Sequence, residues 1–129
     1  MQKIKIITGT YGHEKIKAAM KIISESKTDF IRLDAKDFTF LSLNNKMHEA
    51  AVNQKYLILD NFPEETMLSL LMIHLCHGRY KLQNKSFEDL EVFERPAMII
   101  IVNTTQPIKK TVADFDEHFE IINIFSPIL

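Results

Sequence analysis

The chain has 129 residues, a length that fits one domain with a single core. Apolar residues make up 46% and charged residues 26%, a composition typical of a folded globular protein rather than a disordered one. Sixteen basic and seventeen acidic side chains give a formal net charge of −1, so the chain lacks the overall basic excess of a dedicated nucleic-acid binder.

Cysteine content and apolar run length indicate the compartment. Cys76 is the only cysteine, which excludes an intramolecular disulfide and agrees with a reducing environment. No apolar run approaches the ~20 residues that a membrane span needs. We therefore expect a cytoplasmic protein with no membrane contact.

The first half of the chain predicts alternating strands and helices. Lys3–Thr8 is rich in β-branched residues and indicates a strand that stops at Gly9. Lys15–Ser26 carries apolar residues at helical spacing. Phe30–Leu33 indicates a short second strand, and Leu41–Asn53 a second helix.

The second half predicts a third helix and three more strands. Pro63–His77 indicates the helix, because a proline opens it and acidic residues occupy its first turn. The strands are compact apolar runs at Tyr56–Leu59, Ala97–Val102 and His118–Ile124. Asp60 and Asn103 directly follow the first two of these runs.

Several of these strands are continuous apolar runs, which are typical of strands buried on both faces of a sheet. We therefore expect one α/β domain over residues 1–129, a three-layer sandwich with a five-stranded, mainly parallel sheet. Ligands bind such sheets beyond the carboxyl ends of the strands. The candidate site residues therefore lie in Gly9–Lys15 and at Asp60 and Asn103.

The turn after the first strand contains parts of a phosphate-binding loop. Such a loop needs glycines for tight turns, a helix start whose N–H groups face the anion, and a lysine that reaches the outer phosphates. Gly9, Gly12 and Lys15 match three positions of G-x-x-G-x-G-K-[ST]. Glu14 and Ile16 stand at the last glycine and the Ser/Thr positions. Taken alone, this pattern favours an ordinary strand–turn–helix connection.

The polar residues that follow two later strands favour a phosphate-binding loop over an ordinary connection. Asp60 after an apolar strand matches the Walker B acid, which orients magnesium, and Asn103 matches the sensor position near the terminal phosphate. With these residues the chain resembles the AAA+ group of P-loop NTPases. It looks most like the compact ATPase core of superfamily-three helicases and phage or plasmid primase–helicases, in which a proline-led hydrophobic strand ends in asparagine, as in Arg95–Asn103.

The resemblance implies a P-loop NTPase-like fold without a helical lid, in which the strand Lys3–Thr8 lies centrally, beside Ala97–Val102. It implies ATP and Mg²⁺ as ligands and catalytic roles for Asp60 and Asn103. His13 either faces the nucleotide or faces solvent. The nucleotide-binding residues that it implies are Gly9, Gly12, His13 and Lys15.

Four departures from the family pattern argue against efficient hydrolysis. Glu14 brings a carboxylate close to ligand phosphates, at a cost on the order of 1–4 kcal/mol at roughly 4 Å. Ile16 lacks the hydroxyl that ligates Mg²⁺, and Asn61 cannot act as a glutamate base. The stretch Thr104–His118 contains no arginine to serve as a finger for a neighbouring subunit. ATP and Mg²⁺ are therefore expected to bind weakly or not at all.

Glu14 also has a constructive interpretation. A carboxylate in the first turn of a helix stabilises that helix by about 0.3–1 kcal/mol. Our hypothesis is that Glu14 occupies the anion-binding space of its own loop, so that phosphate is not required there.

A local basic segment lies where the resembling family places a β-hairpin that faces DNA. Arg79, Lys81 and Lys85 surround Tyr80 in this segment, a combination that suits single-stranded DNA. A solvated surface turn is the alternative. No metal site is predicted, because the neighbouring His74, Cys76 and His77 have no second ligand cluster in the sequence.

Two functions remain open. The first is a non-hydrolysing accessory or regulatory module in DNA replication or mobile-element biology, which acts through a protein partner, a second copy of itself, or single-stranded DNA at residues 79–85. The second is an active ATPase of a small helicase-like protein that uses Lys15, Asp60 and Asn103. Glu14 and Ile16 favour the first function, whereas the presence of Lys15, Asp60 and Asn103 together favours the second. A further alternative is a protein-interaction domain with no remaining ligand.

Overall fold

The computed structural model describes residues 3–63, 71–72, 74–75, 79–83, 90–103 and 118–124. Residues 71–72 and 74–75 are helical. The other elements are β1 (Ile4–Gly9), α1 (Gly12–Glu25), β2 (Phe30–Asp34), the 3-10 turn η1 (Ala35–Asp37), α2 (Phe40–Val52), β3 (Tyr56–Pro63), β4 (Arg79–Gln83), β5 (Leu90–Glu94), β6 (Met98–Asn103) and β7 (Phe119–Ile124). The five predicted strands and the first two predicted helices are confirmed.

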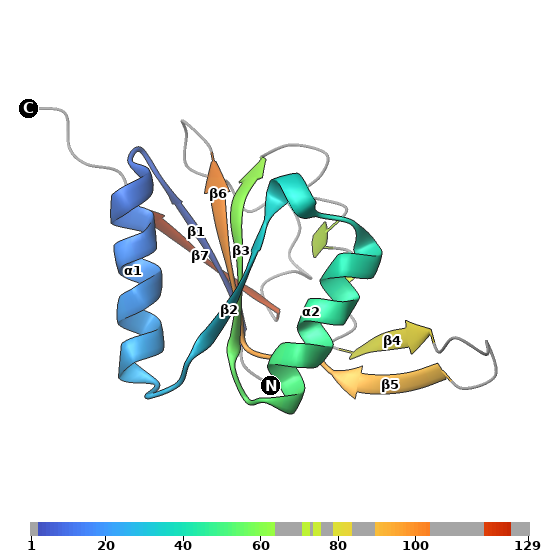
Figure 1. The fold of residues 1–129 in the computed structure, drawn as a ribbon. Coiled ribbons are helices and arrows are strands. Elements are labelled where there is room, and N and C mark those ends of the chain that lie inside the picture. Colours follow the sequence, from blue (N-terminus) through green and yellow to red (C-terminus); the bar gives the residue numbers. More distant parts are fainter. Residues whose placement is uncertain are drawn as a thin grey trace, which may run out of the picture.

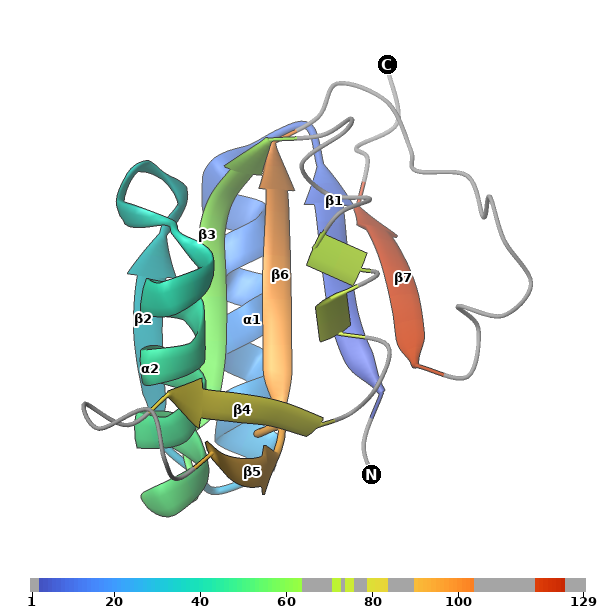
Figure 2. The ribbon, with the colours of Figure 1, turned by 90° about the vertical axis from the view of Figure 1, so that its right-hand side faces the viewer.

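A five-stranded sheet runs through the middle of the molecule, in the order β2-β3-β6-β1-β7 (Figure 2). Its four ladders are all parallel. β1 pairs with β6, as predicted, although β6 rather than β1 takes the middle position. In the Rossmann and flavodoxin-like orders the first strand lies beside the second. Here β2 lies at the far edge from β7, which excludes both of those orders.

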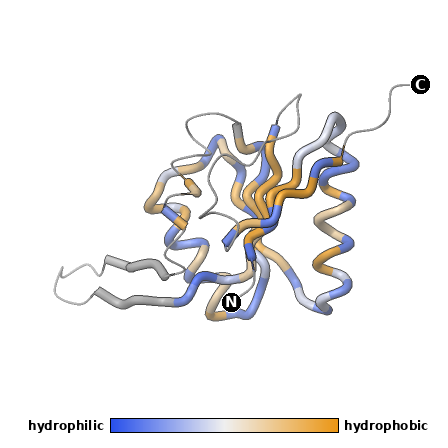
Figure 3. The backbone as a smooth tube through the Cα atoms, turned by 180° about the vertical axis from the view of Figure 1, so that it is seen from behind, coloured by the Kyte–Doolittle hydropathy of each residue, from blue (hydrophilic) through white to orange (hydrophobic). Residues whose placement is uncertain are grey.

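Helices cover both faces of this sheet and give the predicted three layers (Figure 1). α1 packs on one face through Ala19 and Ile23, one helical turn apart. α2 packs on the other face through Leu43, Met47 and Ala50, which follow the same helical spacing. The strands between the helices are the most hydrophobic part of the chain (Figure 3), because they bury side chains on both faces.

The third predicted helix differs from the structure at its start. Pro63 is the last residue of β3 rather than the first of a helix. Between Leu59 and Phe62, β3 holds two residues, Asp60 and Asn61, where β6 holds one, so the extra residue forms a bulge. Proline is tolerated at such irregular strand ends because it has no N–H to donate. The predicted end of that helix lies outside the described residues.

The basic segment forms one arm of an antiparallel hairpin, as the family resemblance implies. β4 pairs with β5 in a register that sets Arg79 opposite Glu94. Figures 1 and 2 place this hairpin near the amino ends of the sheet strands, far from the tips of β3 and β6. Arg95 follows the hairpin, is buried, and donates a 2.7 Å hydrogen bond to the carbonyl oxygen of Leu75.

In the described part of the chain, no helix has both the length and the apolar character to cross a membrane.

The central strand should dominate stability. Ile100 in β6 has no exposed surface, so Ile100→Ala is expected to lower the free energy of unfolding by about 2–5 kcal/mol. Val52, at the end of α2, is 62% exposed, and Val52→Ala should change it by less than about 0.5 kcal/mol. Urea denaturation measures both values, and equal effects would contradict a core centred on β6.

Candidate functional site

The three strands that end in predicted site residues are neighbours. β3, β6 and β1 follow one another in the sheet and run parallel, so their carboxyl ends share one edge (Figure 2). The first turn of α1 lies beside this edge, and its Lys15 side chain reaches the end of β6. The structure therefore brings Gly9, Lys15, Asp60 and Asn103 to one end of the molecule, as the sequence predicts.

The connection between β1 and α1 is shorter than an open phosphate loop. Only Thr10 and Tyr11 separate the strand from the helix, which begins at Gly12, three residues before the predicted start at Lys15. The amide of Lys15 donates to the carbonyl oxygen of Tyr11 at 3.3 Å and closes the first turn. Tyr11 is the N-cap residue, and its side chain makes no capping hydrogen bond.

The two glycines of this connection have different surroundings. A Cβ atom on Gly9 would lie 2.4 Å from the carbonyl oxygen of Ile124 and 3.2 Å from Cγ of Lys15. Gly9 is therefore required where β1 packs closely against the end of β7. A Cβ atom on Gly12 would have no neighbour within 4 Å, so packing alone does not require a glycine there.

Lys15 lies inside the protein. Only 5% of its surface is exposed, and Nζ donates a 2.9 Å hydrogen bond to the carbonyl oxygen of Val102. Burial lowers the pKa of its ammonium below 10.5, whereas attraction to the Asp60 carboxylate raises it in part. The side chain that resembles a phosphate-binding lysine is thus held by the backbone of β6.

Asp60 is also buried, with 4% of its surface exposed, and both of its carboxylate oxygens have partners. Oδ2 forms an ion pair with the Arg32 guanidinium from β2. Oδ1 accepts a hydrogen bond of 2.8 Å from the N–H of Asn61. Both partners come from the chain itself, and Lys15 adds a further attractive charge.

Asp34, at the end of β2, extends this charge cluster. Its Oδ2 lies 3.6 Å from Nη2 of Arg32 and accepts a 3.0 Å hydrogen bond from the Asn61 side-chain amide. The pKa of Asp34 is lowered, first by the hydrogen bond from the N–H of Lys36 and then by that from Asn61. Asn61 has a left-handed φ of 54°, a conformation that asparagine tolerates well.

Neither Arg32 nor Asp34 is singled out by the motif pattern, although two signals point to them. Asp34 directly follows the apolar run Phe30–Leu33, as Asp60 follows Tyr56–Leu59. Arg32 precedes Asp34 by two residues, which places both side chains on the same face of β2. The contact between Arg32 and Asp60 depends on the pairing of β2 with β3, which motif spacing does not report.

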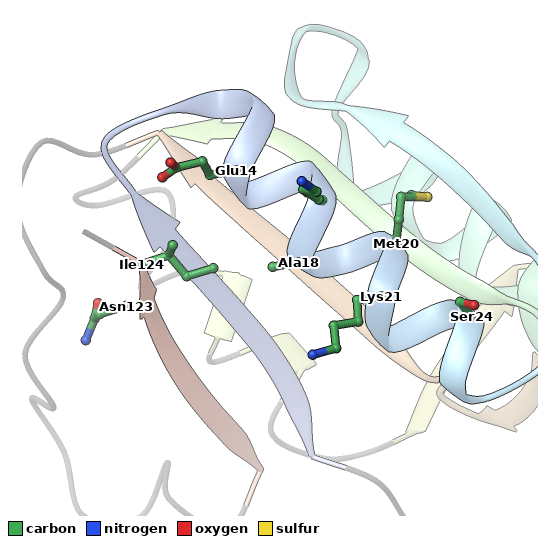
Figure 4. A pocket seen from close by; sticks show the side chains of 8 residues that line it. Glu14, Ala18, Met20, Lys21, Ser24, Asn123 and Ile124 are labelled. Atoms are coloured by element: carbon green, nitrogen blue, oxygen red, sulfur yellow. The ribbon is translucent and has the colours of Figure 1, made fainter. Parts of the chain in front are cut away.

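The remaining predicted site residues lie nearer the surface. His13 is exposed and its ring lies 5.9 Å from that of Tyr11, and Asn103 is exposed at the tip of β6. Glu14 occupies the first turn of α1, as expected. It lines a groove between α1 and β7 together with Lys17 and Lys21, and Figure 4 shows its carboxylate directed toward the ends of β1 and β7.

These residues do not fit a magnesium ion. Mg²⁺ prefers carboxylate oxygens and, in phosphate loops, a hydroxyl, but both Asp60 oxygens already have partners. Ile16 offers no hydroxyl and is 43% exposed. No group of three or more His, Cys, Asp or Glu side chains converges among the described residues.

The other predicted residues do not contribute to this site. Arg79 and Lys81 lie in β4 near the opposite end of the sheet, and Lys85 lies outside the described residues. His74 lies 3.2 Å from Oδ1 of Asn44 and contacts the Phe40 ring at a centroid distance of 4.9 Å. Cys76 and His77 also lie outside the described residues.

The two glycines of the β1–α1 connection should respond oppositely to alanine. Gly9→Ala forces a Cβ against backbone, so the free energy of unfolding should fall by about 1–3 kcal/mol. Gly12→Ala places a better helix former in open space and should be neutral or stabilising by up to about 1 kcal/mol. Urea denaturation compares the two, and a larger loss for Gly12→Ala would contradict the geometry.

The buried ammonium of Lys15 should give stability a specific pH dependence. The pKa of Lys15 is lower in the folded protein than its ordinary 10.5. At pH values between the folded and the ordinary pKa, the unfolded chain therefore binds more protons than the folded protein does. Stability must rise with pH across that window. We expect wild type to gain stability relative to Lys15→Met as pH rises toward 10.5. Urea unfolding of both proteins checks this, and parallel pH profiles would contradict it.

Comparisons with known proteins bear on the fold. No protein-family model matches the chain, and no curated protein matches it. Among solved structures it is similar to one described as the X-ray structure of an inhibitor bound to JCV helicase, with a TM-score of 0.52 and 12% sequence identity. The match covers 98% of this chain and 36% of that chain, so this chain spans about a third of the helicase's length. The chain thus shares an α/β fold with part of that structure.

Proposed function

We propose that this chain is a non-hydrolysing P-loop NTPase-like module with an accessory or regulatory role. The proposal rests on one observation. Lys15 and Asp60, the two charged residues that an ATPase would direct at Mg-ATP, are buried and bonded to groups of the protein itself. A ligand would have to displace these partners before either residue could act on it.

That displacement is costly. Releasing Lys15 leaves the buried carbonyl oxygen of Val102 without its donor, and a buried polar group without a partner costs about 1–3 kcal/mol. Releasing Asp60 separates its buried carboxylate from Arg32, whose side chain is 53% exposed, so the cost is lower than the about 3–5 kcal/mol of a fully buried ion pair. ATP would have to offset both costs while Glu14 adds repulsion, so ATP and Mg²⁺ bind weakly or not at all.

A second candidate function is an active ATPase of a small helicase-like protein. The exposed position of Asn103 at the tip of β6 favours it, because an exposed amide is free to contact a terminal phosphate. This function requires Lys15 to turn out of the interior and Asp60 to exchange Arg32 for a magnesium ion. His13, exposed in the first turn of α1, would then contact the nucleotide.

The module is proposed to act through its surfaces, as one domain over residues 1–129. The hairpin of β4 and β5 carries Arg79 and Lys81 near the end of the sheet opposite the strand tips. Single-stranded DNA bound at residues 79–85 would therefore leave the tips free for a protein partner or a second copy of the chain. By resemblance, the proposed setting is replication of a phage, plasmid or other mobile element in the cytoplasm.

Phosphate release from Mg-ATP distinguishes the two functions. We expect wild type to release no phosphate above the buffer blank in a malachite-green assay, with or without single-stranded DNA, because Lys15 and Asp60 are held internally. The Lys15→Ala variant should give the same blank value, as should the control variant Lys17→Ala, which changes a lysine on the exposed face of α1. Turnover that Lys15→Ala abolishes and Lys17→Ala preserves would establish the ATPase instead.

A further inference from the structure

Two carboxylates meet at the tips of β2 and β3. The parallel register of these strands pairs Asp34 with Asp60, so both side chains point to the same face of the sheet. Oδ2 of Asp34 and Oδ2 of Asp60 both contact Nη2 of Arg32. The Asn61 amide completes the cluster through its hydrogen bond to Asp34.

Without Arg32, this cluster would offer oxygen ligands of the type that hard divalent cations prefer. Two carboxylates on neighbouring strands, with an amide beside them, match the chemistry of magnesium and manganese sites. Like charges this close destabilise each other unless a cation lies between them. The guanidinium of Arg32 supplies that cation, and its planar, permanently charged group suits contacts with two carboxylates.

We propose that Arg32 is a built-in substitute for a divalent cation. Its single positive charge is shared between Asp60 and Asp34 and keeps Mg²⁺ from binding to these two carboxylates. Any phosphate compound that binds beside these carboxylates is therefore bound without metal. The statement about phosphate compounds rests on the proposed function, whereas the exclusion of divalent cations requires no nucleotide and is tested without one.

An ordinary structural ion pair makes a different prediction. If Arg32 only stabilised the fold, its removal would lower the melting temperature and divalent cations would not restore it. If Arg32 occupies a cation site, its removal exposes that site and Mg²⁺ refills it. The two interpretations therefore differ in the response of an Arg32 variant to metal.

The experiment measures melting temperature with and without MgCl₂, against NaCl of equal ionic strength. Wild type should show no specific shift. Arg32→Ala should melt lower than wild type and regain about 2–4 °C in about 10 mM MgCl₂. Manganese binding, followed by electron paramagnetic resonance of free Mn²⁺, should be detected for Arg32→Ala and not for wild type.

Matched variants assign the effect to this cluster. Arg32→Lys keeps the charge and should show no metal response, whereas adding Asp60→Asn to Arg32→Ala should abolish the response. Lys46→Ala removes an exposed ion pair with Glu49 on α2 and serves as the control for losing a cation elsewhere. If the Arg32→Ala protein does not fold, Arg32→Gln is used in its place.

Two results would overturn the proposal. One is a folded Arg32→Ala or Arg32→Gln protein that binds no Mn²⁺ and gains nothing from Mg²⁺. The other is wild-type protein that binds Mn²⁺ through Asp60. Neither result depends on ATP turnover, so failure here is distinguishable from failure of the proposed function.

Discussion

The Asp60 carboxylate is buried at the tip of β3, and a buried charge is stable only when neighbouring groups neutralise it. Arg32 from β2 neutralises it directly, Lys15 from α1 attracts it, and the N–H of Asn61 donates to it. This requirement joins three separate elements at one end of the sheet. The bulge of β3 falls at Asp60 and Asn61, and the side-chain amide of Asn61 donates there to Asp34.

Because Asp60 is neutralised from within the protein, the chain can have the strand arrangement of a ligand-binding sheet without the corresponding chemistry. The parallel sheet, with β3, β6 and β1 as neighbours, retains the arrangement in which strand tips form a ligand-binding edge. Its charged groups contact other groups of the protein. Lys15 donates to the carbonyl oxygen of Val102, and Asp60 pairs with the guanidinium of Arg32. Likeness to the fold of a helicase structure therefore does not by itself imply hydrolysis, since function depends on the groups at the site.

The part of this structure that sequence predicts is the part set by apolar patterning. Continuous runs such as Ala97–Val102 predict buried parallel strands, and the polar residues that follow them predict which tips meet. The start of α1 at Gly12, the extension of β3 to Pro63 and the pairing of Arg32 with Asp60 are not predicted. The last two depend on contacts between residues distant in sequence, and tertiary packing overrides the proline signal at β3. β5 is likewise recognised only through its pairing with β4.

A crystal structure grown with MnCl₂ and a non-hydrolysable ATP analogue tests the central claim most directly, because anomalous scattering locates manganese without ambiguity. The internal neutralisation of Asp60 predicts no anomalous peak at the tips of β2 and β3, with the Arg32 guanidinium still on the Asp60 carboxylate. A manganese ion bound to Asp60, with Arg32 displaced and Lys15 turned toward the phosphates, would contradict it.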